Sequence, residues 1–456
     1  MALEQLTKTT PVTQRLAPHP DFDYDLAIVG GGIVGATLAC ALKNSGLSVV
    51  LIEAQPQSVA VAKSQAYAVS LLSGRILEGI GVWEQILPQI TAFQQIRLSD
   101  ADHAGIVQFY TNDLGTDALG YVGEHRPLLS SLHEFLADCP NVSWLCPAEV
   151  VEVEYQASGV EIKVKVAGES DHIRTRLVVA ADGARSHIRT DAGIGTKGWQ
   201  YWQSCVTARI KTEKPHNNTA FERFWPSGPM GVLPLSGNRC QVVWTAPHAE
   251  AEALKELDEA EFLALLERRT GGLLGRLELE NQRFVFRVQL MQSDRYTQSR
   301  LALIGDAAHC CHPVGGQGLN MGIRDAAALA QVLQDAALQG EDIGDIQVLK
   351  RYERWRKLEN WTILGFTDFL DRLFSNNWLP LVATRRLGLW MLQRIHPFKF
   401  LALRLMTGLM GKPPELATVR SNREQNVPFS SRRFRVVSSQ TSTAAPAVTT
   451  GGKHDS

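Results

Sequence analysis

A glycine-rich turn near the start of the chain constrains the fold more than any other feature. Residues 25–29 form a short apolar run, residues 30–35 follow with the pattern G-x-G-x-x-G, and residues 33–45 have the spacing of small and apolar residues expected of a helix. A second apolar run, 48–52, ends at Glu53. A strand, a helix and a second strand in this order predict a parallel sheet with a right-handed crossover.

The same turn predicts a dinucleotide site. Gly30 allows the tight turn, Gly32 lets the backbone approach a pyrophosphate, and Gly35 lets the helix pack closely on the strand. The helix N-terminus presents free N–H groups to the phosphates, and Glu53 can accept hydrogen bonds from the ribose of an adenosine. The pattern does not distinguish NAD from FAD, and glycine-rich turns also occur for steric reasons alone.

Two further motifs follow apolar, strand-like runs. The first is Asp182-Gly183, a pair that alone usually marks only a turn, followed here by Ser186 and Arg189. The second is the most specific of the three motifs. It begins at Gly305-Asp306 and continues through Pro313 into the glycine-rich residues 315–322.

This last motif has the chemistry of a flavin site. Asp306 at the end of a strand can hold a polyol chain, and the glycines let the backbone approach a flat ring at the start of a helix. The dipole of that helix would stabilise an anionic reduced flavin. The alternative is a glycine-rich helix cap without a ligand, but such a cap would not need an aspartate, a proline and four glycines together.

The bulk composition is that of a globular protein with room for two domains. The 456 residues are 45% hydrophobic and 20% charged, and the net charge of -1 gives no support to a nucleic-acid partner. The seven cysteines lack the spacing of a disulfide framework, which favours a reducing compartment. We expect a cytoplasmic protein, because the sequence shows neither an export signal nor an apolar run long enough to span a bilayer.

The three motifs, in this order, resemble the flavoprotein hydroxylase superfamily that includes para-hydroxybenzoate hydroxylase. Within it, the chain is most similar to the branch of 2-polyprenyl-6-methoxyphenol hydroxylases of ubiquinone biosynthesis. The narrower resemblance rests on segments outside the flavin motifs, namely 66–70, 81–83, 119–126, 228–229, 233–235 and 243–245. It covers roughly residues 25–414.

The resemblance and the strand pattern predict an α/β fold: a Rossmann-like FAD-binding domain with an inserted antiparallel β-sheet substrate domain and a C-terminal helical region. β-forming runs between 206 and 245 indicate the inserted sheet, and helical spacing after Gly318 indicates the C-terminal region. The expected segments are a flexible leader (1–23), the FAD-binding domain (24–90, 119–192 and 295–340), the substrate domain (91–118 and 193–294), the helical region (341–420) and a disordered tail (421–456).

The resemblance implies FAD as the cofactor and NAD(P)H as the co-substrate. It places the ADP half of FAD on Gly30, Gly32, Gly35 and Glu53, and the ribityl chain on Asp306. The other cofactor-binding positions that it implies are Arg126, Asp182, Gly183, Gly305, Pro313, Gly316, Gly318, Leu319 and Asn320.

One position departs from the branch pattern. The branch usually has an arginine before its Ala-x-Ala-x-Ser segment, and this chain has Gln65. Because the family uses that arginine near the flavin, the sequence leaves open whether the contact is lost or whether Arg126 replaces it.

The activity implied by the resemblance is hydroxylation of the aromatic ring of a lipophilic (polyprenyl) phenol or quinone precursor through a flavin C4a-hydroperoxide, in ubiquinone-type quinone biosynthesis. Because the cofactor carries this chemistry, we identify no side chain as catalytic. Two alternatives stay open. One is an FAD-dependent reductase or epoxidase of an isoprenoid, and the other is a catalytically idle flavoprotein in a quinone-synthesis complex, toward which only Gln65 points.

Two smaller features have competing interpretations. The His-Cys-Cys-His run at 309–312 suggests a metal, but four consecutive residues do not readily converge on one ion, so we expect no metal site. Residues 372–414 contain seven basic and no acidic residues, interleaved with Trp, Phe, Leu and Met. This segment is either a helical hairpin covering the core or a surface that docks on anionic membrane, and the two interpretations are compatible.

Overall fold

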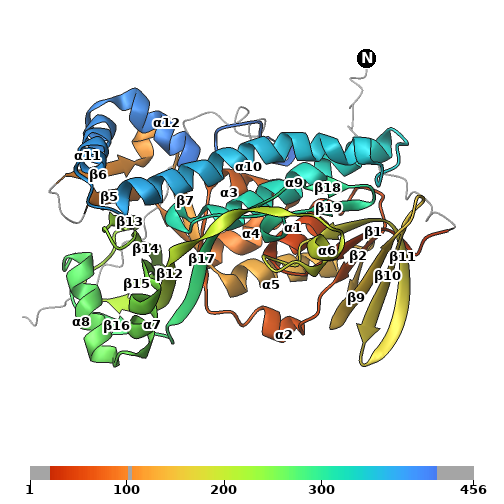
Figure 1. Cartoon of the computed structure of the whole chain (residues 1–456), viewed down its shortest axis with the longest axis horizontal. Coiled ribbons are helices and arrows are strands. Elements are labelled where there is room, and N and C mark those ends of the chain that lie inside the picture. Colours follow the sequence, from red (N-terminus) through yellow and green to blue (C-terminus); the bar gives the residue numbers. More distant parts are fainter. Residues whose placement is uncertain (1–20, 101–104, 419–456) are drawn as a thin grey trace, which may run out of the picture.

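The computed structural model describes residues 21–100 and 105–418. Most of the expected leader and all of the expected tail lie outside these residues. The chain forms an α/β fold with two large sheets, and helices cover both sheets (Figure 1). The fold class predicted from the sequence is confirmed. The domain boundaries stay a prediction.

The first large sheet carries the glycine-rich turn. Its main strands run in the order β18-β19-β11-β1-β2-β8, and β10 and β9 extend from β11. The pairs β11–β1, β1–β2, β2–β8 and β11–β19 are parallel. Its strands are β1 (Tyr24–Val29), β2 (Val49–Ile52), β8 (Val142–Leu145), β9 (Ala148–Tyr155), β10 (Val160–Val166), β11 (Glu169–Ala180), β18 (Thr297–Gln298) and β19 (Leu301–Leu303).

The second large sheet is antiparallel except where β5 pairs with β13 in parallel. The order is β20-β17-β12-β15-β14-β13-β5-β6, and β16 pairs with β12. Its strands are β5 (Gln95–Asp100), β6 (Ile106–Tyr110), β12 (Thr196–Thr212), β13 (Thr219–Phe224), β14 (Met230–Leu235), β15 (Arg239–Pro247), β16 (Leu277–Leu279), β17 (Phe284–Ser293) and β20 (His309–Cys310). A small sheet of β3 (Ala66–Val69), β7 (Gly120–Glu124) and β4 (Thr91–Phe93) completes the β-structure of the described chain.

Helices pack on both large sheets. On the first sheet, α1 contacts both α5 and α9. On the second, Leu254 of α7 and Phe262 of α8 are buried against the face that carries Val242 and Trp244. The helices are α1 (Ile33–Ala41), α2 (Gln57–Ala60), α3 (Leu71–Ile80), α4 (Trp83–Ile86), α5 (His125–Ala137), α6 (His187–Asp191), α7 (His248–Glu256), α8 (Glu259–Thr270), α9 (Gln317–Leu338), α10 (Ile346–Phe374), α11 (Leu379–Arg394) and α12 (His396–Met406).

One helix joins the two parts of the molecule. α10 is continuous through Gly365, where the helical spacing of the sequence is interrupted. Figure 1 shows it running from the side of the first sheet to α11 and α12, which lie beside β5 and β6. The three C-terminal helices therefore cover the second sheet on the side opposite α7 and α8.

Candidate active site

The turn between β1 and α1 has the geometry of a dinucleotide site. Gly30 has φ +109°, and a Cβ there would lie 2.4 Å from the Ala181 carbonyl oxygen; at Gly35 it would lie 2.0 Å from the carbonyl oxygen of Gly30. A Cβ at Gly32, the N-cap of α1, would meet nothing within 4 Å. Two glycines thus permit close packing, and the third leaves open space where a pyrophosphate would approach the helix.

The acid at the end of β2 fixes this turn. The Gly31 N–H donates to Glu53 Oε2 at 2.7 Å, and the Gln55 N–H donates to Oε1 at 2.8 Å. Glu53 therefore lies directly beside the glycine turn, as a ribose-binding acid should.

The Asp-Gly motif lies next to this turn, at the end of β11. Asp182 Oδ1 is buried and has no hydrogen-bond partner among the described residues, and burial raises the pKa of this carboxyl. Gly183 has φ +86° with open space around it. Arg189 reaches the third motif, donating to the Ala307 carbonyl at 2.9 Å. The unpaired oxygen fits a group that donates hydrogen bonds from a bound cofactor.

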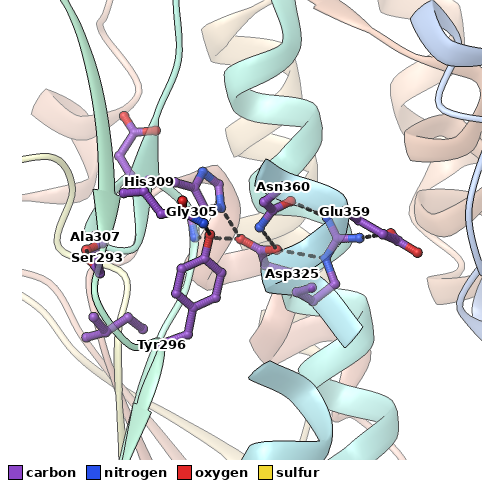
Figure 2. A network of polar contacts seen from close by, with 12 residues as sticks. Ser293, Tyr296, Gly305, Ala307, His309, Asp325, Glu359 and Asn360 are labelled. Atoms are coloured by element: carbon purple, nitrogen blue, oxygen red, sulfur yellow. Dashed lines mark hydrogen bonds and ion pairs between the residues drawn. The ribbon is translucent and has the colours of Figure 1, made fainter. Parts of the chain in front are cut away.

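A buried ionic network fixes the turn before Asp306 (Figure 2). Asp325, fully buried on α9, accepts from His309 at 2.6 Å and from the Gly305 N–H at 3.2 Å through one oxygen. Its other oxygen accepts from Arg356 at 2.9 Å and from Asn360 at 3.0 Å, both on α10. Burial raises the pKa of Asp325, but His309 and Arg356 more than offset this and hold it at about 2. An ionised carboxylate therefore joins α9, α10 and the Gly305 turn.

Asn320 performs a similar structural role. Its side-chain oxygen accepts from the Ser70 N–H at 2.8 Å, and its amide donates to the carbonyls of Ala68 and Gly316 at 2.8 and 2.7 Å. The amide thus holds β3 against the Gly315-Gly316 turn, whose residues both have positive φ. Asn320 would therefore affect a bound flavin indirectly, by fixing the backbone of Ala68 and Gly316.

A cavity of about 820 Å³ lies between these turns and the second sheet. The predicted flavin residues on one wall are Asp306, Pro313, Gly316, Gly318 and Leu319. Gln65 and Tyr67 lie on the same wall, and the Tyr67 hydroxyl donates to the Gln65 side chain at 2.9 Å. Burial raises the pKa of Asp306. These five residues of the third motif thus face one cavity, which is of the size expected for a small-molecule site.

The opposite wall comes from β-strands and C-terminal helices. Its apolar members include Leu98, Phe224, Leu233, Val243, Leu370, Phe374, Leu389, Leu392, Phe398, Leu401 and Leu405. Polar side chains that the sequence did not single out also line it, among them Thr207, Glu222 and Gln241. They come from different strands, so only the register of the sheet could have identified them.

Other predicted positions lie away from the cavity. The four positions expected to bind the ADP half of FAD, Gly30, Gly32, Gly35 and Glu53, are not in its lining, and neither are Asp182 and Gly183. Arg126, in the first turn of α5, is exposed and also outside it. Its contact with FAD stays a prediction, as does any compensation for Gln65.

The His-Cys-Cys-His run does not converge. His309 pairs with Asp325, His312 lies 3.5 Å from Asp371, and Cys310 and Cys311 line the cavity. Within the described ranges, no group of three or more His, Cys, Asp or Glu side chains is arranged to hold a metal ion.

The fold, the glycine turn and the cavity beside Asp306 define a flavoprotein with room for a substrate next to the flavin. Residues 23–367 match the family model of the FAD binding domain. The chain is 55% identical over 401 residues to the uncharacterised protein slr1300 of Synechocystis sp., covering 88% of this chain and 97% of that protein. It is 38% identical over 394 residues to the ubiquinone hydroxylase UbiL of Rhodospirillum rubrum, covering 86% and 91%.

A solved structure supports the same assignment of fold. The p-nitrophenol 4-monooxygenase PnpA from Pseudomonas putida superposes with a TM-score of 0.71 at 20% sequence identity, over 85% of this chain and 98% of that one. The chain therefore belongs to the family of FAD-dependent hydroxylases that share this FAD binding domain. FAD is its cofactor, and NAD(P)H is the co-substrate typical of the family.

Proposed function

We propose that this protein hydroxylates the aromatic ring of a phenol or quinone precursor with a polyprenyl tail, in ubiquinone-type quinone biosynthesis. The name of UbiL, a ubiquinone hydroxylase, supports the pathway. The observation that carries the proposal is the cavity: it begins at the flavin residues and continues between apolar side chains of the second sheet and the C-terminal helices.

The cavity reaches an apolar part of the surface. Three aromatic or aliphatic residues both line the cavity and remain about half exposed: Phe369 on α10 (56%), Phe398 on α12 (47%) and Leu401 on α12 (53%). A long apolar tail could therefore lie along α10 and α12 while the ring lies beside the flavin. A small polar substrate would leave most of this apolar lining without a partner.

The cofactor and the two walls of the cavity make different contributions to the reaction. Bound FAD, once reduced by NAD(P)H, supplies the activated dioxygen, and the chain supplies position and dryness. Asp306 and the turns around Gly316 hold the flavin side, while the apolar wall orients the ring and excludes water from the reacting atoms.

We also propose that α11 and α12 contact anionic membrane, from which such a substrate would enter. Of the large apolar residues in 372–414, those at least 40% exposed are Trp378, Leu379, Leu387, Trp390, Phe398, Phe400, Leu401 and Met410. Arg386, Arg394 and Arg404 are exposed among them. No helix within the described ranges is long and apolar enough to cross a bilayer, so the contact would be peripheral. Membership of a quinone-synthesis complex stays a prediction.

Not all seven cations of the segment are free to meet lipid. Arg385 is buried and donates to Asp100 at 2.8 Å, and Lys399 lies 2.6 Å from Asp113. These two basic residues fix α11 and α12 to β5 and to the residues after β6. The helical-hairpin interpretation and the membrane interpretation therefore apply to different side chains of one segment.

The direct test uses purified holoenzyme, NAD(P)H, labelled dioxygen and a phenol carrying a short prenyl chain. We expect one labelled oxygen atom in the ring of the product. A reduced prenyl chain without label would identify a reductase, and label in the chain would identify an epoxidase. Absence of any product, with flavin bound, would favour the idle flavoprotein.

A further inference from the structure

One row of residues crosses the second sheet on its cavity side. Leu98 on β5 pairs with Glu222 on β13, Glu222 with Gly231 on β14, Gly231 with Val243 on β15, and Val243 with Thr207 on β12. All five residues line the cavity. Because neighbours in register point to the same face of a sheet, a carboxyl and a hydroxyl are presented to the same space.

Glu222 is a carboxyl group without a protein partner. Its side chain forms no hydrogen bond or ion pair with any residue of the described ranges. Gly231 provides the room for it, since a Cβ there would lie 3.3 Å from Glu222 Oε2. Burial raises the pKa of this carboxyl to about 8. A carboxyl group that faces an apolar cavity without a partner in the protein is costly unless a ligand provides one.

Two more polar atoms on the same wall lack partners. The Thr207 hydroxyl and the Gln241 side-chain oxygen are buried without a hydrogen bond in the described chain, and their residues are 7% and 1% exposed. The Gln241 amide is used, donating to the carbonyls of Ala208 and Val242. Its oxygen is therefore oriented by the backbone and has no donor in the described chain.

We propose that Glu222 accepts the hydrogen of a free hydroxyl on the substrate ring, and that Thr207 and Gln241 bind a second oxygen substituent. This inference rests on the proposed function and narrows the substrate class. The substrate ring carries one free hydroxyl and a second oxygen substituent, and an ether in which the free hydroxyl is alkylated is not a substrate. The same contacts place the ring against the sheet, with its other side toward the flavin wall.

The proton balance is simple. The phenol O–H bond breaks, a Glu222 Oε–H bond forms, and the negative charge moves to the ring oxygen, which makes the ortho and para carbons more electron-rich. When the ring regains aromaticity after oxygen insertion, its oxygen takes the proton back from Glu222, and the displaced ring hydrogen leaves as a proton. A carboxyl with a pKa of about 8 is a better match for a phenol, whose pKa is about 10, than an ordinary carboxyl would be.

Few other groups near Glu222 titrate in the same range. Cys205 on β12 is close enough to be affected by it, and burial raises the pKa of this thiol to about 12. Arg385 from α11 is paired with Asp100, and Arg287 from β17 lies on the same wall. Asp306, whose pKa burial also raises, is retained in a Glu222 variant. A difference in pH profile between wild type and that variant therefore isolates Glu222.

The test compares wild type with Glu222→Gln, Glu222→Leu and the matched control Glu278→Gln, an exposed residue on β16. Binding of a short-chain prenylphenol and of its methyl ether is followed by the change in flavin absorbance. Above pH 8, where Glu222 is ionised, we expect wild type and Glu278→Gln to bind the phenol at least about tenfold more tightly than the ether, because a charge-assisted hydrogen bond is lost in the ether. Glu222→Leu should lose the preference while keeping its full complement of FAD.

Turnover gives the second readout. Wild-type kcat/KM for the phenol should rise with pH until about 8, because ionised Glu222 is the proton acceptor, and then level off. In Glu222→Gln this rise should disappear and kcat should fall about 100-fold or more, with little change in KM. Equal preference for phenol and ether in wild type, or an unchanged pH profile in Glu222→Gln, would overturn the assignment. A wild type that distinguishes the two ligands but inserts no oxygen would instead refute the proposed function.

Discussion

The two walls of the cavity are built in opposite ways. The flavin wall, formed by the turns around Asp306 and Gly316, is held in place by polar side chains. A single carboxylate, that of Asp325, accepts hydrogen bonds from His309, Arg356, Asn360 and the Gly305 backbone. The opposite wall consists mainly of apolar side chains from sheet and helices. Its helices are fixed to the sheet by few ionic contacts, of which the buried one joins Arg385 to Asp100.

This difference matches what each wall has to do. A cofactor is the same molecule in every turnover, so a network that fixes the backbone near Asp306 is useful. An apolar tail needs volume and dryness, which many combinations of Leu, Phe and Met provide. We therefore expect the stability of the flavin wall to fall when a single polar group is removed. The stability of the apolar wall should fall little when both members of an ion pair are replaced by apolar residues.

The largest effect is expected at Asp325. Replacing it with Ala leaves buried Arg356 with the Glu359 carboxylate alone and takes the acceptor away from His309, so it should lower the free energy of unfolding by about 3–5 kcal/mol. Urea denaturation of the holoenzyme and of the FAD-free protein measures this loss separately from loss of the cofactor. A loss below about 1 kcal/mol in both forms would contradict the central position of Asp325.

The buried ion pair between Arg385 and Asp100 provides the second test of this comparison. Arg385→Met alone should destabilise by about 3 kcal/mol, because Asp100 is left buried and unpaired, whereas Asp100→Leu with Arg385→Met should recover to within about 1 kcal/mol of wild type. The corresponding double change of Asp325 and Arg356 should not recover, because His309 and Asn360 stay without their acceptor. Equal recovery at both sites would remove the distinction between the walls.

Asp306→Ala tests the flavin wall without disturbing its scaffold. The variant should fold normally and bind FAD about ten- to a hundredfold more weakly, a loss of about 1.5–3 kcal/mol, because donors on the ribityl chain lose a charged acceptor. Fluorescence titration of the FAD-free protein gives the dissociation constant. Unchanged affinity would mean that the Gly305-Asp306 segment serves only as a turn.

The smallest effect is expected on the membrane surface. Arg386→Gln should weaken binding to vesicles of anionic lipid by about 1 kcal/mol, roughly fivefold, and added salt should reduce the difference. Lys165→Gln removes one positive charge from β10, at the other end of the molecule from α11 (Figure 1), and serves as the control. Equal sedimentation of wild type and both variants at low salt would leave α11 and α12 only the role of covering the cavity.

The turns that carry the predicted flavin residues follow from the sequence because local rules govern them. Positive φ at Gly30, Gly315 and Gly316 belongs to turns whose residues are adjacent in the chain, and the strand and helix on each side have clear apolar periodicity. Asp325 follows the glycine-rich residues 315–322 and lies on α9. Its partners Arg356 and Asn360 come from α10, however, and a spacing of 31 and 35 residues carries no local signal.

The apolar wall could not be predicted in the same way. Glu222 and Thr207 share one row only because three antiparallel pairings set the register, and one pairing, β5 with β13, is parallel where an antiparallel sheet was expected. Arg385 meets Asp100 across 285 residues. The sequence could show that residues 372–414 are basic and apolar, but not which of the cations are buried.

The most direct test of the account measures how the tail of the substrate contributes to turnover. For one phenol ring with and without a single prenyl unit, purified holoenzyme should show a kcat/KM at least about tenfold higher for the prenylated ring, because each buried CH₂ contributes about 0.8 kcal/mol. The preference should shrink in Leu401→Glu, which places a charge where the cavity lining is exposed. Equal kcat/KM for the two rings in wild type would contradict the claim that the cavity between flavin and surface holds a lipophilic tail.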